Sequence, residues 1–103
     1  MAFKELADKL GLKEEQFREI LKTFISTSLS DIDKLRTAYE NKDARSAIEA
    51  AHSLKGASGN LGFMDISVIA RNAEESARSN NFDGLNDTVA LLKEKLDLIR
   101  KNL

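Results

Sequence analysis

The sequence of 103 residues contains no cysteine, no proline and no tryptophan, and it has only five glycines. The absence of cysteine excludes disulfides, thiolate catalysis and zinc–thiolate sites. Without proline, nothing forces a long helix to break. Aromatic residues make up 6% of the chain, too few to support many strands. These absences favour a chain made of long helices.

Long apolar runs and an excess of either charge are also missing. No apolar run approaches the ~20 residues needed to span a bilayer, and the N-terminus has no apolar signal core. The 16 basic residues nearly balance the 17 acidic ones, for a net charge of −1, which offers no attraction to nucleic acid or to an anionic membrane. We therefore expect a cytoplasmic location, for this chain or for a longer protein that contains it, with neither nucleic acid nor membrane as a partner.

Apolar residues recur every three or four positions along most of the chain, which is the period of a helix with one buried face. Short connections make consecutive helices antiparallel neighbours, and the length is that of one domain, residues 1–103. The expected fold is therefore all-α, an antiparallel up-down-up-down four-helix bundle with a short additional N-terminal helix. The helices expected on this basis cover residues 1–10, 13–39, 44–59, 64–79 and 84–103.

Two aspartates are expected to cap helices, because a side-chain carboxylate can accept a hydrogen bond from the free N–H groups of a first turn. Asp43 precedes the second of the four long helices and Asp83 precedes the last, whose apolar stripe runs on to Leu103. The helix after Asp43 buries mainly small residues, so a neighbouring helix can approach it closely.

His52 is the only histidine, and three notable residues follow it at helical offsets: Lys55 at i+3, Gly56 at i+4 and Gly59 at i+7. These offsets lie on one helix face. His52 sits beside the buried stripe of its helix, so we expect it to be partly exposed. A neutral imidazole is a nucleophile whose free ring nitrogen can accept a phosphoryl group. Lys55 would place a cation beside the resulting anion, and the glycines would clear the face for a partner.

Other interpretations of this segment stay open on residue pattern alone. Each glycine inside a helix costs ~1 kcal/mol relative to alanine, which points to a functional need. Alternatively, the helix ends at Lys55 with Gly56 as a left-handed cap, and a lone histidine beside an apolar stripe is more often structural. Glu49-x-x-His52 matches one element of a di-iron bundle, but such a site needs two. No serine triad or nucleotide-binding loop is present.

Residues 51–63, Ala-His-Ser-Leu-Lys-Gly-Ala-Ser-Gly-Asn-Leu-Gly-Phe, resemble the signature of histidine phosphotransfer (HPt) domains. The pattern is His-x-x-Lys-Gly, then small residues, then an apolar residue and a glycine six positions after the first glycine. Ala70-x-x-Ala73-Glu74-x-x-Ala77-Arg78 is similar to the following family segment, with Ala73 in place of the usual leucine.

The resemblance implies a phosphorelay carrier. His52 would accept a phosphoryl group on Nε2 from the aspartate of one receiver domain and pass it to another. Lys55 would help to neutralise that group, Gly56 and Gly59 would permit docking, Gly62 would allow a tight turn, and Glu74 would orient the ring through its other nitrogen.

The resemblance also implies partners and excludes a resident cofactor. The expected partners are receiver domains of response regulators and of a hybrid sensor histidine kinase. The chain would act as a monomer and would not be an enzyme on its own. The segment is equally similar to the phosphotransfer domain of chemotaxis-type kinases, which a separate ATP-binding domain phosphorylates. A helical interaction module that is never phosphorylated is a further alternative.

Overall fold

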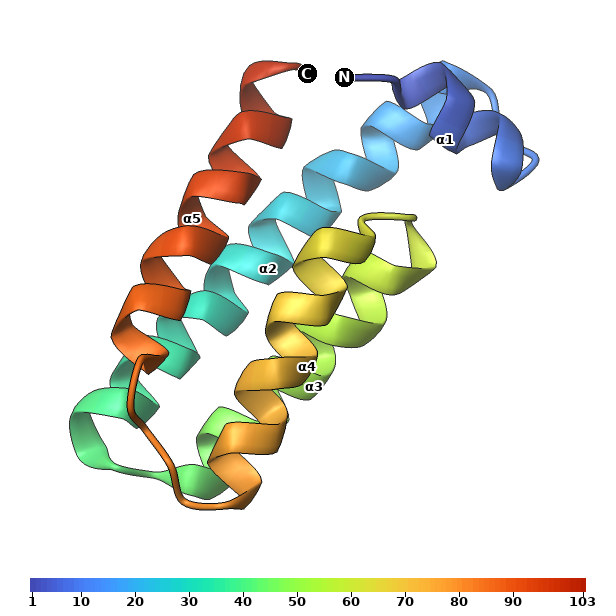
Figure 1. Cartoon of the computed structure of the whole chain (residues 1–103). Coiled ribbons are helices and arrows are strands. Elements are labelled where there is room, and N and C mark those ends of the chain that lie inside the picture. Colours follow the sequence, from blue (N-terminus) through green and yellow to red (C-terminus); the bar gives the residue numbers. More distant parts are fainter.

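The computed structural model describes all 103 residues and contains five helices and no strand. Helices α2 to α5 run alternately up and down, and α1 packs against the N-terminal part of α2 (Figure 1). The expected all-α four-helix bundle with an added short helix is confirmed. None of the helices is both long enough and apolar enough to span a membrane. The helices are α1 (Phe3–Lys9), α2 (Glu14–Asn41), α3 (Ala44–Asn60), α4 (Met64–Arg78) and α5 (Leu85–Lys101).

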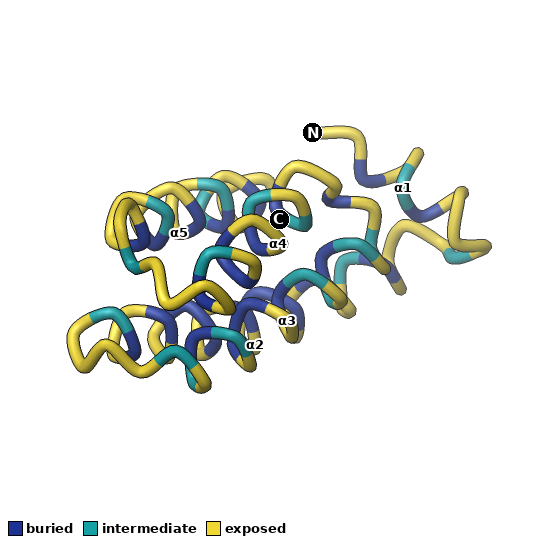
Figure 2. The backbone as a smooth tube through the Cα atoms, turned by 60° about the horizontal axis from the view of Figure 1, so that its bottom comes forward, coloured by how far each residue is buried: buried dark blue, intermediate teal, exposed yellow.

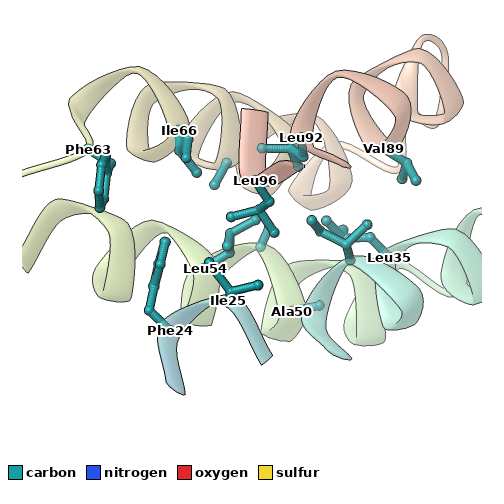
Figure 3. Packing of buried hydrophobic residues seen from close by; sticks show 14 of the residues in the cluster. Phe24, Ile25, Leu35, Ala50, Leu54, Phe63, Ile66, Val89, Leu92 and Leu96 are labelled. Atoms are coloured by element: carbon teal, nitrogen blue, oxygen red, sulfur yellow. The ribbon is translucent and has the colours of Figure 1, made fainter. Parts of the chain in front are cut away.

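The four long helices form a closed square in which α2 packs on α3 and α5, and α4 packs on the same two helices. Helices α3 and α5 lie diagonally opposite each other, and their backbones do not come close. One cluster of 23 buried apolar residues fills the centre (Figure 2). Figure 3 shows how α2 contributes large side chains to it: the ring of Phe24 stacks on that of Phe63, with centroids 5.6 Å apart.

Helices α3 and α4 make the most extensive contact in the bundle, and both helices bury mainly small residues. Short side chains let two helix backbones approach closely, and this was expected for the helix after Asp43. The close approach matters for function, because it brings side chains of α3 within hydrogen-bonding reach of α4. The buried alanines are Ala47, Ala50 and Ala51 on α3, and Ala70, Ala73 and Ala77 on α4.

One of the two predicted helix caps is confirmed and the other is wrong. Asp43 accepts hydrogen bonds from the backbone N–H of Ser46 at 3.2 Å and from its hydroxyl at 2.7 Å. Asp83 does not cap α5; its own N–H donates to the side chain of Asn81 in a local turn, and the residue at the N-cap is Gly84. The turn delays the start of α5 by one residue.

The apolar stripes read from the sequence also differ from the buried faces at several positions. Leu103 lies beyond the end of α5 and is exposed, because the helix stops at Lys101. On α2, Ile20 and Leu29 are exposed, while Asp31 is buried. The Asp31 carboxylate accepts a hydrogen bond from the hydroxyl of Ser53 on α3 at 2.8 Å, which makes its burial tolerable.

Helix α3 does not end at Lys55. It continues through Gly56 and Gly59 to Asn60, so the left-handed cap at Gly56 is wrong. The left-handed residue is Gly62, with a φ of +88°, in the turn before α4. A Cβ atom added to Gly62 would lie 3.0 Å from Cδ2 of Leu6, so this turn also forms part of the surface on which α1 packs.

Gly62→Ala is expected to destabilise the fold by about 1–2 kcal/mol, because a side chain is strained at positive φ and would press on Leu6. Urea denaturation measures the loss. Gly11→Ala is the matched control, since Gly11 also has positive φ but has open space around it. The control should lose less stability; equal losses would show that the contact with Leu6 contributes nothing.

Candidate functional site

His52 lies on the outer face of α3, with 66% of its side chain exposed, in agreement with the expected partial exposure. Its Nδ1 atom is 2.9 Å from Oε2 of Glu74, which is 22 residues further along the chain on α4. The close approach of the two helices makes this contact possible. The other ring nitrogen, Nε2, has no hydrogen-bond partner in the chain.

Glu74 is a buried carboxylate, with only 4% of its side chain exposed. Burial raises the pKa of such a group, but hydrogen bonds from Lys55, Arg78 and His52 outweigh it and lower the pKa from 4.5 to about 2. Lys55 Nζ donates to Oε1 at 2.7 Å, and Arg78 Nη2 donates to Oε2 at 3.0 Å. Glu74 is therefore ionised at neutral pH.

The ionised carboxylate decides which nitrogen of the imidazole carries the proton. A carboxylate only accepts hydrogen bonds, so Nδ1 of His52 must be the N–H donor in this contact. The neutral ring then has its free lone pair on Nε2, on the exposed side of the residue. The arrangement supplies an oriented nitrogen nucleophile with two cations close by.

Lys55 and the glycines occupy positions that differ in part from the expected ones. The ammonium of Lys55 is not free beside His52 but is hydrogen-bonded to Glu74. Gly56 is exposed, with nothing within 4 Å of an added Cβ, whereas a Cβ on Gly59 would lie 3.2 Å from Oγ of Ser67 on α4. Gly56 thus faces outward, Gly59 faces the α3–α4 contact, and Gly62 lies in the turn.

Two residues of this network carried no assigned role in the sequence. Arg78 stands four residues after Glu74 on α4, and this spacing is a recognisable signal for a helical ion pair. Ser67 donates its hydroxyl to the backbone oxygen of Lys55 at 3.0 Å and so ties α4 to α3 beside the site. That bond has no sequence signal, because it depends on how the two helices dock.

The family model described as the Hpt domain matches residues 19–102 of this chain. The chain belongs to the Hpt domain family. Among solved structures it is similar to histidine-containing phosphotransfer protein B (HptB) from Pseudomonas aeruginosa PAO1. That similarity has a TM-score of 0.82 and 26% identity, over 92% of this chain and 83% of the other. No curated protein sequence matches the chain.

Family membership establishes the general function. The chain is a histidine phosphotransfer domain of a phosphorelay, the class of module that interacts with receiver domains. The match to the Hpt family begins within α2, so α1 lies outside it. The network around Glu74 lies wholly inside the matched region.

Proposed function

We propose that His52 is the phosphoryl acceptor of this Hpt domain and that Nε2 is the atom that reacts. The observation that carries the proposal is the pairing of Nδ1 with the buried Glu74 carboxylate at 2.9 Å, while the rest of the ring is exposed. His52 is also the only histidine in the chain.

In the proposed step, the Nε2 lone pair forms a bond to the phosphorus of a receiver's aspartyl phosphate. The P–O bond to the aspartate breaks, and its electron pair stays on the aspartate oxygen. The ring keeps its Nδ1 proton and becomes positively charged as the N–P bond forms. Glu74, held ionised by its donors, stabilises this charge in place. Transfer to a second receiver is the same step in reverse.

We assign Lys55 to the phosphoryl group, because it stands one turn after His52 on the same helix. The partners we propose are receiver domains of response regulators and of a hybrid sensor kinase. Residues 1–103 would form one domain. It would act as a monomeric carrier in the cytoplasm. Since phosphoryl transfer requires mainly positioning and charge stabilisation, the receiver supplies the rest of the site.

The two helical glycines divide between docking and packing in this proposal. Gly56 costs the helix ~1 kcal/mol relative to alanine, yet no internal contact requires it, since the space around it is open. We infer that it leaves room for the receiver beside His52. Gly59 instead serves the close approach of α3 to Ser67 on α4.

The proposal is tested by incubating the chain with a receiver domain phosphorylated by a small-molecule phosphodonor. The expected product is a phosphoprotein whose label is lost in acid and kept in base, as for a phosphorus–nitrogen bond. A label that survives acid would place the group on a hydroxyl and contradict the assignment to His52.

Gly56→Ala is expected to separate docking from stability. The free energy of unfolding should rise by up to ~1 kcal/mol, because alanine is the better helix former and meets no neighbour. Phosphoryl transfer from the receiver should slow. Gly56→Leu should slow transfer further, while its free energy of unfolding stays close to that of Gly56→Ala. Ala90→Leu, an exposed position on α5, is the control and should transfer at the parent rate. Parent-like transfer by both Gly56 variants would remove the docking role.

A further inference from the structure

In the proposed reaction Lys55 interacts with two anions, the Glu74 carboxylate and the phosphoryl group on His52. In the unphosphorylated domain its ammonium lies 2.7 Å from Oε1 of Glu74. Once a phosphoryl group stands on Nε2 of His52, the same ammonium is required there. Moving it away would remove a cation from a carboxylate that is only 4% exposed, and a buried charge without a partner is strongly unfavourable.

Arg78 provides a second cation for Glu74 on the other oxygen. Its Nη2 donates to Oε2 at 3.0 Å, next to the Nδ1–H of His52, while Lys55 holds Oε1 alone. An arginine remains protonated at all relevant pH values. Counting Lys55, Arg78, Glu74 and a neutral imidazole, the unphosphorylated cluster has one positive charge in excess. Removing Lys55 from it leaves Glu74 and Arg78 as a balanced pair.

We propose that Arg78 is a positioning residue for phosphoryl transfer, which keeps the Glu74 carboxylate neutralised and oriented so that Lys55 can leave it for the phosphoryl group. The inference rests on the proposed role of His52 as acceptor. It assigns Arg78 no contact with the phosphoryl group, because its guanidinium is bonded to the carboxylate oxygen on the Nδ1 side of the ring.

If the proposal is right, Arg78 affects the rate of phosphoryl transfer only when Glu74 is charged. Arg78→Gln should slow transfer from a phosphorylated receiver about tenfold, the factor typical of one charge-assisted hydrogen bond. Arg78→Lys, which keeps the charge, should recover most of the rate. In a Glu74→Gln background no buried charge remains, so adding Arg78→Gln should cause no further slowing. A tenfold loss in both backgrounds would mean that Arg78 acts on the phosphoryl group or the receiver, and would overturn the proposal.

Arg71 offers a matched control, because it lies two turns before Arg78 on α4, is exposed and has no ion pair. Arg71→Gln removes the same charge and should leave the transfer rate unchanged. If Arg71→Gln slows transfer as much as Arg78→Gln does, the effect of Arg78 comes from the net charge of the domain and not from its contact with Glu74.

A second readout needs no phosphorylation. Arg78→Gln should raise the pKa of Glu74 toward its ordinary value, so less stability should be lost between about pH 4.5 and pH 2 than in the parent, and Arg71→Gln should not change this loss. If His52 is not the acceptor, either the parent remains unlabelled or His52→Gln labels like the parent, and both results separate failure of the proposed function from failure of this inference.

Discussion

His52→Gln is expected to abolish phosphorylation of the domain, with a fall in label of about a hundredfold or more, because the step loses its only nitrogen nucleophile. The fold should survive. The side chain is 66% exposed, so its replacement removes little buried surface, and the glutamine amide can still donate to Glu74. Thermal and urea unfolding should therefore stay within about 1 kcal/mol of the parent. The measurement is the label transferred from a phosphorylated receiver, with circular dichroism to verify the fold.

Arg45→Gln is a suitable control for this experiment. Arg45 is highly exposed and lies two turns before His52 on the same helix, where it pairs only with Glu49. Its replacement should leave the label intact. A His52→Gln protein that labels like its parent would show that another group is the acceptor.

Acid is expected to destabilise the domain chiefly through Glu74. Its pKa is about 2 in the folded protein against an ordinary value of 4.5. Because the folded value is the lower one, the native state binds the proton more weakly than the unfolded chain. The resulting stabilisation is fully present above about pH 4.5 and is lost as the pH falls toward 2. The difference of about 2.5 units corresponds to roughly 3 kcal/mol.

Glu74→Gln tests this by removing the titrating group while keeping its shape and an oxygen acceptor. Urea unfolding measured from pH 7 to pH 2 should show the variant less stable than the parent at neutral pH, with the gap closing at low pH. Glu75→Gln is the matched control, since Glu75 is the exposed neighbour and makes no ion pair. A constant gap across this range would mean that Glu74 is not preferentially ionised in the folded state.

These two predictions concern the same physical arrangement. The ionised carboxylate that holds the proton on Nδ1, and so leaves Nε2 nucleophilic, also makes the fold sensitive to acid. Its ionisation depends on Lys55 and Arg78, since burial alone would favour the protonated form. Loss of either cation should therefore weaken both the reactivity of His52 and the stability of the domain near neutral pH.

Part of the site could be read from the sequence. The offset of three residues places Lys55 one turn from His52 on any helix, and the resemblance to Hpt domains implied Glu74 as the orienting residue. The sequence did not reveal that Lys55 is bonded to Glu74, or that Arg78 completes the pairing. It also grouped Gly59 with Gly56, although they face different surroundings. Offsets along one helix say nothing about the rotation of the next one.

The sequence by itself determined the five helices, their antiparallel order and the exposure of His52, because helical periodicity and short connections are local properties of the chain. The tertiary structure alone decided the chemistry around that histidine. The close approach of α3 to α4 buries Glu74 and brings Lys55 and Nδ1 of His52 to its two oxygens, where Arg78 of α4 also binds. The contacts of His52 and Lys55 with Glu74 join residues about 20 positions apart, and no local pattern encodes them; only the pair of Arg78 with Glu74, four residues apart, has a local signal.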